Sequence, residues 1–240
     1  MHSIIHIKPT ISYYLETSSK LDKVLNIFIR INSGGTELSH SDLLLSIASA
    51  QWEKLDAREE ITNFVDEINN IGNGFKFNKD FVLKTSLVLS DFSGIAFKVD
   101  NFNKTNMLEI ESKWSEITKA IRLSINLVSG YGYNRDTLSS TNALIPIAYY
   151  LLKIGLPENF EKSNNTIEDR GKILRWLSSS LLKRTFSGQP DNILRQTRTI
   201  LKNENGMFPI NEITEFFKGT NIYFHQKKKL LKGFLKIKKI

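Results

Sequence analysis

The clearest periodic pattern in the chain covers residues 21–31. Its apolar positions recur at helical spacing, and they are Leu21, Val24, Leu25, Ile27, Phe28 and Ile31. This spacing places them on one wide face of a helix. Gly34 and Gly35 end the pattern, because glycine readily adopts the left-handed conformation that closes many helices. Ser39, followed three residues later by Asp42, predicts the capped start of a second helix.

The same periodicity continues through most of the remaining sequence. It predicts helices over 56–70, from 78 onward, and over 105–129, 139–154, 166–185, 190–202 and 211–218. Asp56 and Asn78 stand where side-chain caps are expected. Pro146 lies inside the 139–154 segment, where it is expected to remove one backbone hydrogen bond and kink the helix.

Extended structure is expected in only two short places. Residues 3–15 are rich in β-branched and aromatic side chains, and Pro9 among them favours an edge strand or a short β remnant. A second short strand is predicted at 95–99, within a connector over 91–103. The predicted fold class is therefore mainly α, a multi-helix bundle. Its predicted parts are an extended segment at 1–20, a helical domain at 21–218 and a basic tail at 219–240.

The composition is that of an ordinary globular protein. The chain has 240 residues, of which 40% are hydrophobic and 24% are charged, and it contains no cysteine. Disulfides, thiolate nucleophiles and cysteine-based zinc sites are thereby excluded. The N-terminus lacks the basic and apolar regions of a secretory signal, and no stretch approaches the roughly 18 apolar residues of a membrane span. We therefore expect a cytoplasmic protein.

The net charge of +8 is concentrated at the C-terminus. Residues 227–240 contain seven lysines and no acidic residue, whereas the rest of the chain has 26 basic and 25 acidic residues. The apolar residues of this tail fall on one helical side, opposite most of its lysines; they are Leu230, Leu231, Phe234, Leu235 and Ile237. Such a segment can bind an anionic membrane or nucleic acid, or cover an apolar surface. We favour an accessory tail over a membrane anchor.

The sequence offers no self-contained active site. Its four histidines follow no metal-ligand pattern, and neither GxGxxG nor the P-loop motif occurs. Glu111-Ser112-Lys113 has the acid-x-Lys spacing of metal-dependent nucleases, but Pro190-Asp191 comes after it and no later acid-x-Lys pair follows. Glu111 is expected to be a solvent-exposed charge on a helix face. The sequence therefore predicts no catalytic residue and no metal site.

Basic residues gather on the predicted helices over 166–185 and 190–202. Arg195, Arg198 and Lys202 recur at helical spacing and share one face. The preceding helix carries Arg170, Arg175, Lys183 and Arg184. These side chains are candidates for contacts to DNA phosphates, with Arg184, Arg195, Arg198 and Lys202 as the predicted set. The alternative is a solvated face whose charge is offset by nearby acids.

The loop at residues 30–36 reads Arg-Ile-Asn-Ser-Gly-Gly-Thr. Arg30 is expected near a helix C-terminus, where its charge complements the negative end of the helix dipole. Asn32 and Thr36 are residue types that hydrogen-bond within turns. These local properties account for a corner between two helices and carry no function by themselves.

The surroundings of this loop resemble the N-terminal ParB-like domain of the GmrSD-type, modification-dependent (type IV) restriction family. The matching segments are Phe28–Ser39 with Ser41-Asp42-Leu43, Asn142–Tyr150, and Phe186-Ser187-Gly188 with Asp191 and Leu194-Arg195. The resemblance covers roughly residues 20–202. Its most specific part is the Arg–Asn–Gly–Gly segment of the loop.

The resemblance implies a role in bacterial defence against foreign DNA, including modified phage DNA. It implies nucleotide binding at the family's loop positions, here Arg30, Asn32, Gly34, Gly35 and Thr36. It also implies a nucleoside triphosphate with Mg as cofactors of the complete protein, and a separate HNH-type domain that cuts DNA. The family's Asp-Gly-Gln-Gln-Arg segment and the HNH residues do not occur in this sequence. The chain alone is therefore expected to be non-catalytic: a split subunit, a truncated gene or a fragment.

Three functions are compatible with these observations. The first is a non-catalytic helical component that associates with DNA or with a partner subunit. The second is a regulatory domain that binds a GTP- or UTP-type nucleotide. The third is a purely structural module that packs against a missing ParB-like or HNH-containing partner, or against a second copy of the chain in a homo-oligomer.

Overall fold

A computed structural model describes residues 23, 27 and 40–218 of the chain. The chain divides into two compact units, Met1–Leu43 and Leu44–Ile240, and the packing described below belongs to the second. The predicted extended segment at 1–20, most of the predicted 21–31 helix, the 30–36 loop and the basic tail lie outside the described residues. The predicted domain boundaries at residues 20 and 218 therefore remain predictions.

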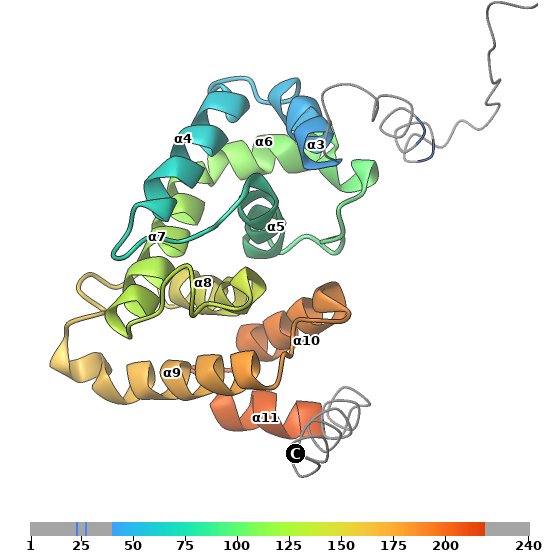
Figure 1. Cartoon of the computed structure of the whole chain (residues 1–240). Helices are drawn as coiled ribbons and strands as arrows, with labels where there is room; N and C mark the ends of the chain where they lie inside the picture. Colours follow the sequence, from blue (N-terminus) through green and yellow to red (C-terminus); the bar gives the residue numbers. More distant parts are fainter. Residues whose placement is uncertain (1–22, 24–26, 28–39, 219–240) are drawn as a thin grey trace, which may run out of the picture. The chain divides into compact units, whose positions relative to one another are not determined.

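The described part is a bundle of helices, and residues 40–218 contain no β-strand. The α-helices are α3 (His40–Ser49), α4 (Ala57–Asn69), α5 (Lys79–Leu89), α6 (Lys104–Ser112), α7 (Trp114–Gly130), α8 (Ile145–Lys153), α9 (Ile167–Leu182), α10 (Pro190–Asn203) and α11 (Ile210–Lys218). Short 3-10 helices are η1 (Val99–Phe102), η2 (Thr141–Leu144) and η3 (Asn164–Thr166). The predicted mainly α bundle is confirmed (Figure 1). No helix in this part of the chain is both long and apolar enough to cross a membrane.

The centre of the bundle is α8. All residues from Ile145 to Leu151 are buried, and the helix contacts α5, α7 and α10. At its end, the ammonium group of Lys153 donates to the carbonyl oxygens of Leu201, at 2.5 Å, of Lys202, at 3.1 Å, and of Glu204. These carbonyls belong to the C-terminal end of α10, where a cation also complements the helix dipole. Lys153 thus links two neighbouring helices.

Two predicted helix caps are confirmed. The carboxylate of Asp56 accepts the backbone N–H groups of Arg58, at 2.9 Å, and Glu59, at 3.1 Å, at the start of α4. The amide oxygen of Asn78 accepts from the N–H of Phe81 at 3.0 Å at the start of α5. Both caps satisfy donors that the first turn of a helix leaves unpaired.

The predicted strand at 95–99 is wrong. This segment has no neighbouring strand among the described residues, and it forms local bonds that lead into η1 instead. The N–H of Lys98 donates to the carbonyl of Ala96 at 2.8 Å, and the side chain of Asn101 donates to the same carbonyl at 2.7 Å. The apolar residues that suggested a strand, including Ile95 and Val99, are buried as parts of a compact loop.

The expected kink at Pro146 is also wrong. The 139–154 segment is not one helix, because η2 covers Thr141–Leu144 and α8 begins at Ile145. Pro146 is therefore the second residue of α8. In the first turn a missing N–H costs no intrahelical hydrogen bond, so proline is favoured at this position.

The predicted helix over 105–129 is two helices, with a break at Lys113. The N–H of Lys113 is shared between the carbonyls of Glu109 and Ile110, as is common at helix ends. Trp114 begins α7, and its ring makes an edge contact with that of Trp52, with the ring centroids 5.3 Å apart. Its indole N–H donates a hydrogen bond to the carboxylate of Glu60 at 2.7 Å. Because of this break, α6 and α7 are separate helices, and Trp114 at the start of α7 packs against Trp52 and Glu60.

Glu111, predicted to be a solvent-exposed charge, is instead buried, with 7% of its surface accessible. Its carboxylate accepts three consecutive backbone N–H groups: those of Glu53 at 3.1 Å, Lys54 at 2.6 Å and Leu55 at 2.8 Å. Burial by itself raises the pKa of Glu111. The three N–H donors and the charge of Lys54 together lower it by more than burial raises it, so its pKa lies below the ordinary value of 4.5. The residue ties the loop between α3 and α4 to α6.

A second buried carboxylate, that of Asp169, joins three segments of the bundle. It accepts the hydroxyl of Tyr150 at 2.5 Å and the backbone N–H of Phe208 at 2.7 Å. Burial raises the pKa of Tyr150, and the hydrogen bond to the Asp169 carboxylate raises it further, so the phenol remains a donor. This contact fixes α9 against α8 and against the segment before α11.

Candidate nucleic-acid interface on α9 and α10

Helices α9 and α10 each bury one face and expose the other. The buried residues of α10 are Ile193, Leu194, Thr197 and Leu201, which recur at helical spacing. Pro190 starts the helix at a position where proline is favoured. In α9 the buried side includes Ile173, Trp176 and Leu177. The ring of Trp176 packs against that of Phe186 in the following loop, with the ring centroids 6.3 Å apart. The arginines lie on the remaining faces, together with two exposed apolar residues of α9, Ile167 and Leu182.

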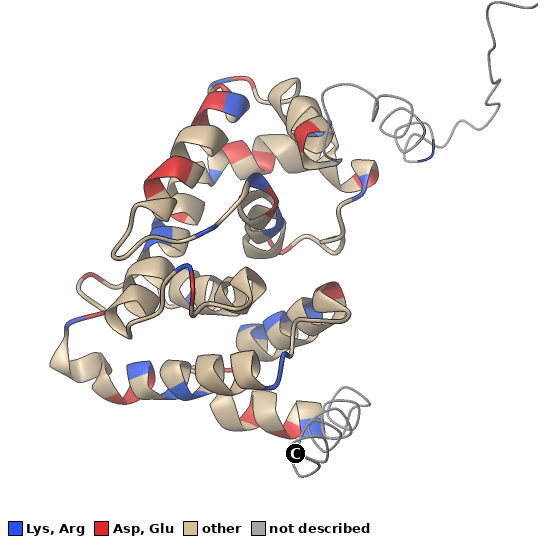
Figure 2. Cartoon of the chain, in the orientation of Figure 1, with Lys and Arg blue, Asp and Glu red and all other residues tan. Residues whose placement is uncertain are grey.

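The segment from 170 to 202 is strongly basic. It contains eight lysine and arginine residues and one acidic residue, Asp191. The carboxylate of Asp191 is itself paired with the buried ammonium group of Lys84 at 2.5 Å. Figure 2 shows the positions of lysine and arginine residues along both helices. The positive charge of this segment is therefore not balanced from within it.

Arg184 is exposed at the junction between α9 and α10, in an unusual conformation. Its φ of 52° is left-handed, a region that glycine favours. The N–H of Thr185 donates to Ser180 O at 2.9 Å and that of Arg184 to Leu181 O at 3.0 Å, which is the hydrogen-bond pattern that closes a helix at a left-handed residue. The chain thus keeps a long cation where glycine would be less strained.

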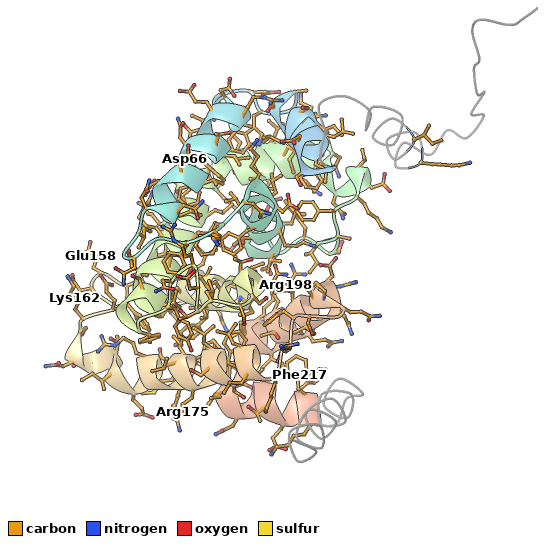
Figure 3. The ribbon with its side chains drawn as sticks, viewed as in Figure 1. Asp66, Glu158, Lys162, Arg175, Arg198 and Phe217 are labelled. Atoms are coloured by element: carbon orange, nitrogen blue, oxygen red, sulfur yellow. The ribbon has the colours of Figure 1, made fainter. Side chains whose placement is uncertain are left out.

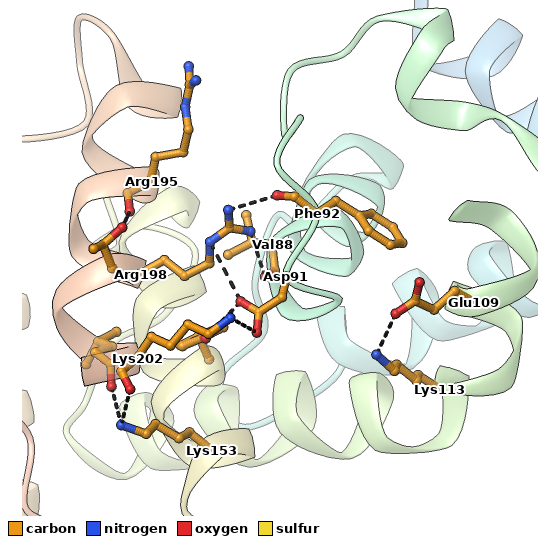
Figure 4. Close-up of polar contacts among 12 residues, drawn as sticks. Val88, Asp91, Phe92, Glu109, Lys113, Lys153, Arg195, Arg198 and Lys202 are labelled. Atoms are coloured by element: carbon orange, nitrogen blue, oxygen red, sulfur yellow. Dashed lines mark hydrogen bonds and ion pairs between the residues drawn. The ribbon is translucent and has the colours of Figure 1, made fainter. Parts of the chain in front are cut away.

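The three predicted residues of α10 have different environments (Figure 4). Arg195 is exposed, and its guanidinium is directed away from the neighbouring polar cluster. Arg198 has only 12% of its side chain accessible and donates to the carbonyl oxygens of Phe92, at 2.8 Å, and Val88, at 3.3 Å. Lys202 is exposed and pairs with Asp91 at 3.0 Å. Arg198 is therefore used within the bundle, whereas Arg195 is presented to the outside.

Asp91 is the centre of the polar cluster, a role that no local pattern in the sequence predicts. It directly follows the C-cap of α5 and has a left-handed φ of 60°. Its carboxylate accepts the hydroxyl of Tyr149 at 2.9 Å and lies 3.9 Å from the Nε of Arg198. Burial raises the pKa of Tyr149, and the hydrogen bond to Asp91 raises it further. Its partners come from α8 and α10, which lie far from it in the sequence.

Replacing Arg198 by alanine is expected to lower the free energy of unfolding by about 2 kcal/mol, because two carbonyls at the end of α5 lose a charged donor. Urea denaturation followed by circular dichroism measures this change. Arg195→Ala is the matched control on the same helix, and it is expected to change stability by less than about 0.5 kcal/mol. Equal effects of the two substitutions would contradict the assigned roles.

The predicted nucleotide-binding residues Arg30, Asn32, Gly34, Gly35 and Thr36 lie outside the described residues, and their role remains a prediction. Within the part that the structure does describe, no group of three or more His, Asp or Glu side chains is placed to hold a metal ion. The best-supported site in this part is therefore the basic face of α9 and α10. Its exposed arginines are Arg175, Arg184 and Arg195, and none of them has an ion-pair partner among residues 40–218.

The described residues form a helical bundle in which α9 and α10 carry exposed arginines. Comparison of the sequence with family models and with curated proteins finds no match.

Proposed function

We propose that this chain is a non-catalytic helical component of a GmrSD-like bacterial restriction system and that the basic face of α9 and α10 contacts the DNA backbone. The observation that carries the proposal is the set of exposed arginines in segment 170–202, Arg175, Arg184 and Arg195, which have no ion-pair partner among residues 40–218. Arginine side chains presented on a helix face bind phosphates and release counter-ions from DNA. The resemblance around residues 28–43 supports the restriction setting.

Contacts of this kind are independent of base sequence. Arg184 and Arg195 are exposed cations, and backbone contacts position a protein on DNA without reading its bases. The proposed role is therefore to hold DNA while another component of the system recognises or cuts it. Binding is expected to be weak and to fall steeply as salt concentration rises.

The test is the affinity of the protein for a fluorescent DNA duplex as a function of salt, measured by anisotropy. The double substitution Arg184→Glu and Arg195→Glu is expected to weaken binding by about tenfold or more and to reduce the salt slope by about 2. Lys76→Glu with Lys119→Glu gives the same change in net charge at exposed positions elsewhere, and this control is expected to bind much more tightly than the double variant. Because the seven lysines of 227–240 are themselves candidates for contacts to DNA phosphates, each variant is also measured in a chain that lacks them.

A single substitution separates binding from stability. Arg184→Gly removes the cation but relieves the left-handed backbone, so it is expected to stabilise the fold by about 0.5–1 kcal/mol while weakening DNA binding. A loss of affinity in a more stable protein cannot come from unfolding. Absence of any binding at low salt, or equal loss in the Lys76/Lys119 control, would overturn the proposal.

A further inference from the structure

An apolar pocket lies where α9, α10 and α11 meet. Its volume is about 90 Å³, and its apolar lining residues are Trp176, Phe186, Ile193, Ile210, Ile213 and Phe217. Phe217 is in the last turn of α11 (Figure 3) and lines the pocket together with residues of α9 and α10. Sites for small molecules usually have volumes of about 300–1,000 Å³, so this pocket suits one or two apolar side chains better than a ligand.

The end of α11 continues this apolar surface. Phe216 and Phe217 are consecutive, and their rings are in edge contact with the centroids 5.4 Å apart. Phe216 is exposed over 39% of its surface. An exposed aromatic ring beside an apolar pocket marks a surface that another apolar segment can cover. Lys218, the last described residue, comes next, so the segment that follows α11 starts beside the pocket.

The basic tail carries an apolar side of the kind that would fit there. Within 227–240 the residues Leu230, Leu231, Phe234, Leu235 and Ile237 fall on one side of a helix, opposite most of the lysines. Only the eight residues 219–226 separate this segment from α11, and extended chain of that length spans up to about 26 Å. The first of them, Gly219, is the residue type that most often ends a helix and lets the chain turn.

This short connection favours the chain's own tail over any other occupant. A segment held by a short linker is present at an effective concentration of about 1 mM, far above that of a second copy at micromolar concentration. Charge contributes little to the choice. The exposed carboxylates of Glu212 and Glu215 flank the α11 side of the pocket, but Lys183 lines its α9 side. Burial of apolar surface is therefore the main driving force.

We propose that residues 227–240 pack against this pocket as a further helix of the bundle, with their apolar side inward and their lysines outward. Packed in this way, the apolar side is withdrawn from membranes and from other copies of the chain. The pocket is not lined by Arg175, Arg184 or Arg195. The proposed DNA contacts and this packing can therefore fail independently.

The experiment measures how fast a single thiol in the tail of the full chain reacts with Ellman's reagent, since the chain has no cysteine of its own. Leu231→Cys places the thiol on the apolar side of the tail, and Lys236→Cys, the matched control, places it on the lysine side. Each rate is divided by the rate of the same variant in urea, which removes differences in intrinsic reactivity. Leu231→Cys is expected to react about tenfold or more slowly than Lys236→Cys, because a packed thiol reacts only when the tail opens.

A substitution in the pocket tests where the tail packs. Ser179 is half-buried and lines the pocket, and Ser179→Arg is expected to remove the protection of Leu231→Cys by filling the pocket with a long cation. Thr199→Arg adds the same charge at an exposed position of α10 and is expected to leave the protection unchanged. Circular dichroism checks that both variants are folded, and the comparison of the two tail positions holds even if Ser179→Arg does not fold.

The conditions of the measurement separate the other occupants. Protection is expected to persist at about 1 M salt, where the Debye length is only about 3 Å and contacts made through lysines alone are screened. Equal rates at the two tail positions, protection that survives in folded Ser179→Arg, or protection lost at high salt would each overturn the proposal. Protection that rises with protein concentration would assign the tail to a second copy instead. Protection that appears only with vesicles of anionic phospholipid would assign it to a membrane, and would equally overturn the proposal.

Discussion

Replacing Glu111 by alanine is expected to lower the free energy of unfolding by about 3–5 kcal/mol. The carboxylate accepts the N–H groups of Glu53, Lys54 and Leu55, and alanine would leave these three backbone donors without their acceptor. Each buried donor that loses its partner costs about 1–3 kcal/mol, reduced where water can enter. Urea or thermal denaturation measures the effect. Glu109→Ala, which removes an exposed ion pair with Lys113, is the control and is expected to cost less than about 1 kcal/mol.

The same carboxylate predicts a dependence of stability on pH. The folded state holds the pKa of Glu111 below its ordinary value of 4.5, so its contribution to stability is fully present above that value. It is lost as the pH falls through the lowered pKa of the folded state. Glu111→Gln removes this titration, and its melting temperature is expected to fall less steeply on acidification than that of the unaltered protein. Identical pH profiles would contradict the assignment.

Replacing Asp169 by alanine is expected to cost about 3–4 kcal/mol, because the hydroxyl of Tyr150 and the N–H of Phe208 both lose a charged acceptor. Asp169→Asn retains one oxygen for the N–H of Phe208 and is expected to be milder. Tyr150→Phe removes one donor and should cost less than Asp169→Ala, and the double substitution should cost less than the sum of the two. Denaturant unfolding of these four variants measures the coupling.

The control for this series is Glu168→Ala, at the neighbouring position in α9. The Glu168 side chain is exposed and pairs with Lys172 across one helical turn, so its loss is expected to change stability by less than about 0.5 kcal/mol. An equally mild effect of Asp169→Ala would show that water replaces the missing carboxylate.

Features that depend on neighbouring residues could be predicted from the sequence. Asp56 and Asn78 cap helices because each bonds to N–H groups two or three residues ahead, and the helices over α9, α10 and α11 follow from local periodicity. The segmentation of 105–129 and 139–154 was predicted less well. It depends on where Trp114 packs and on which turn contains Pro146, and neither is apparent in a local pattern.

The candidate site shows the same division. The basic residues of α9 and α10 are evident in the sequence, but which of them lie within the bundle is not. Arg198 bonds to carbonyls 106 and 110 residues away, and Glu111 to N–H groups 56 to 58 residues away. Helical spacing places Arg195 and Arg198 on one face, yet the end of α5 engages only Arg198.

The two cationic contacts at helix ends have a consequence for how the bundle opens. Lys153 of α8 donates hydrogen bonds to carbonyl groups at the C-terminal end of α10, and Arg198 of α10 donates to carbonyl groups at the C-terminal end of α5. Helix α5 in turn packs against α8. Separating any one of these helices leaves carbonyl groups of another exposed, so none of them gains by fraying alone. Native-state amide hydrogen exchange should therefore give similar opening free energies for α5, α8 and α10. The three helices would behave as one cooperative unit.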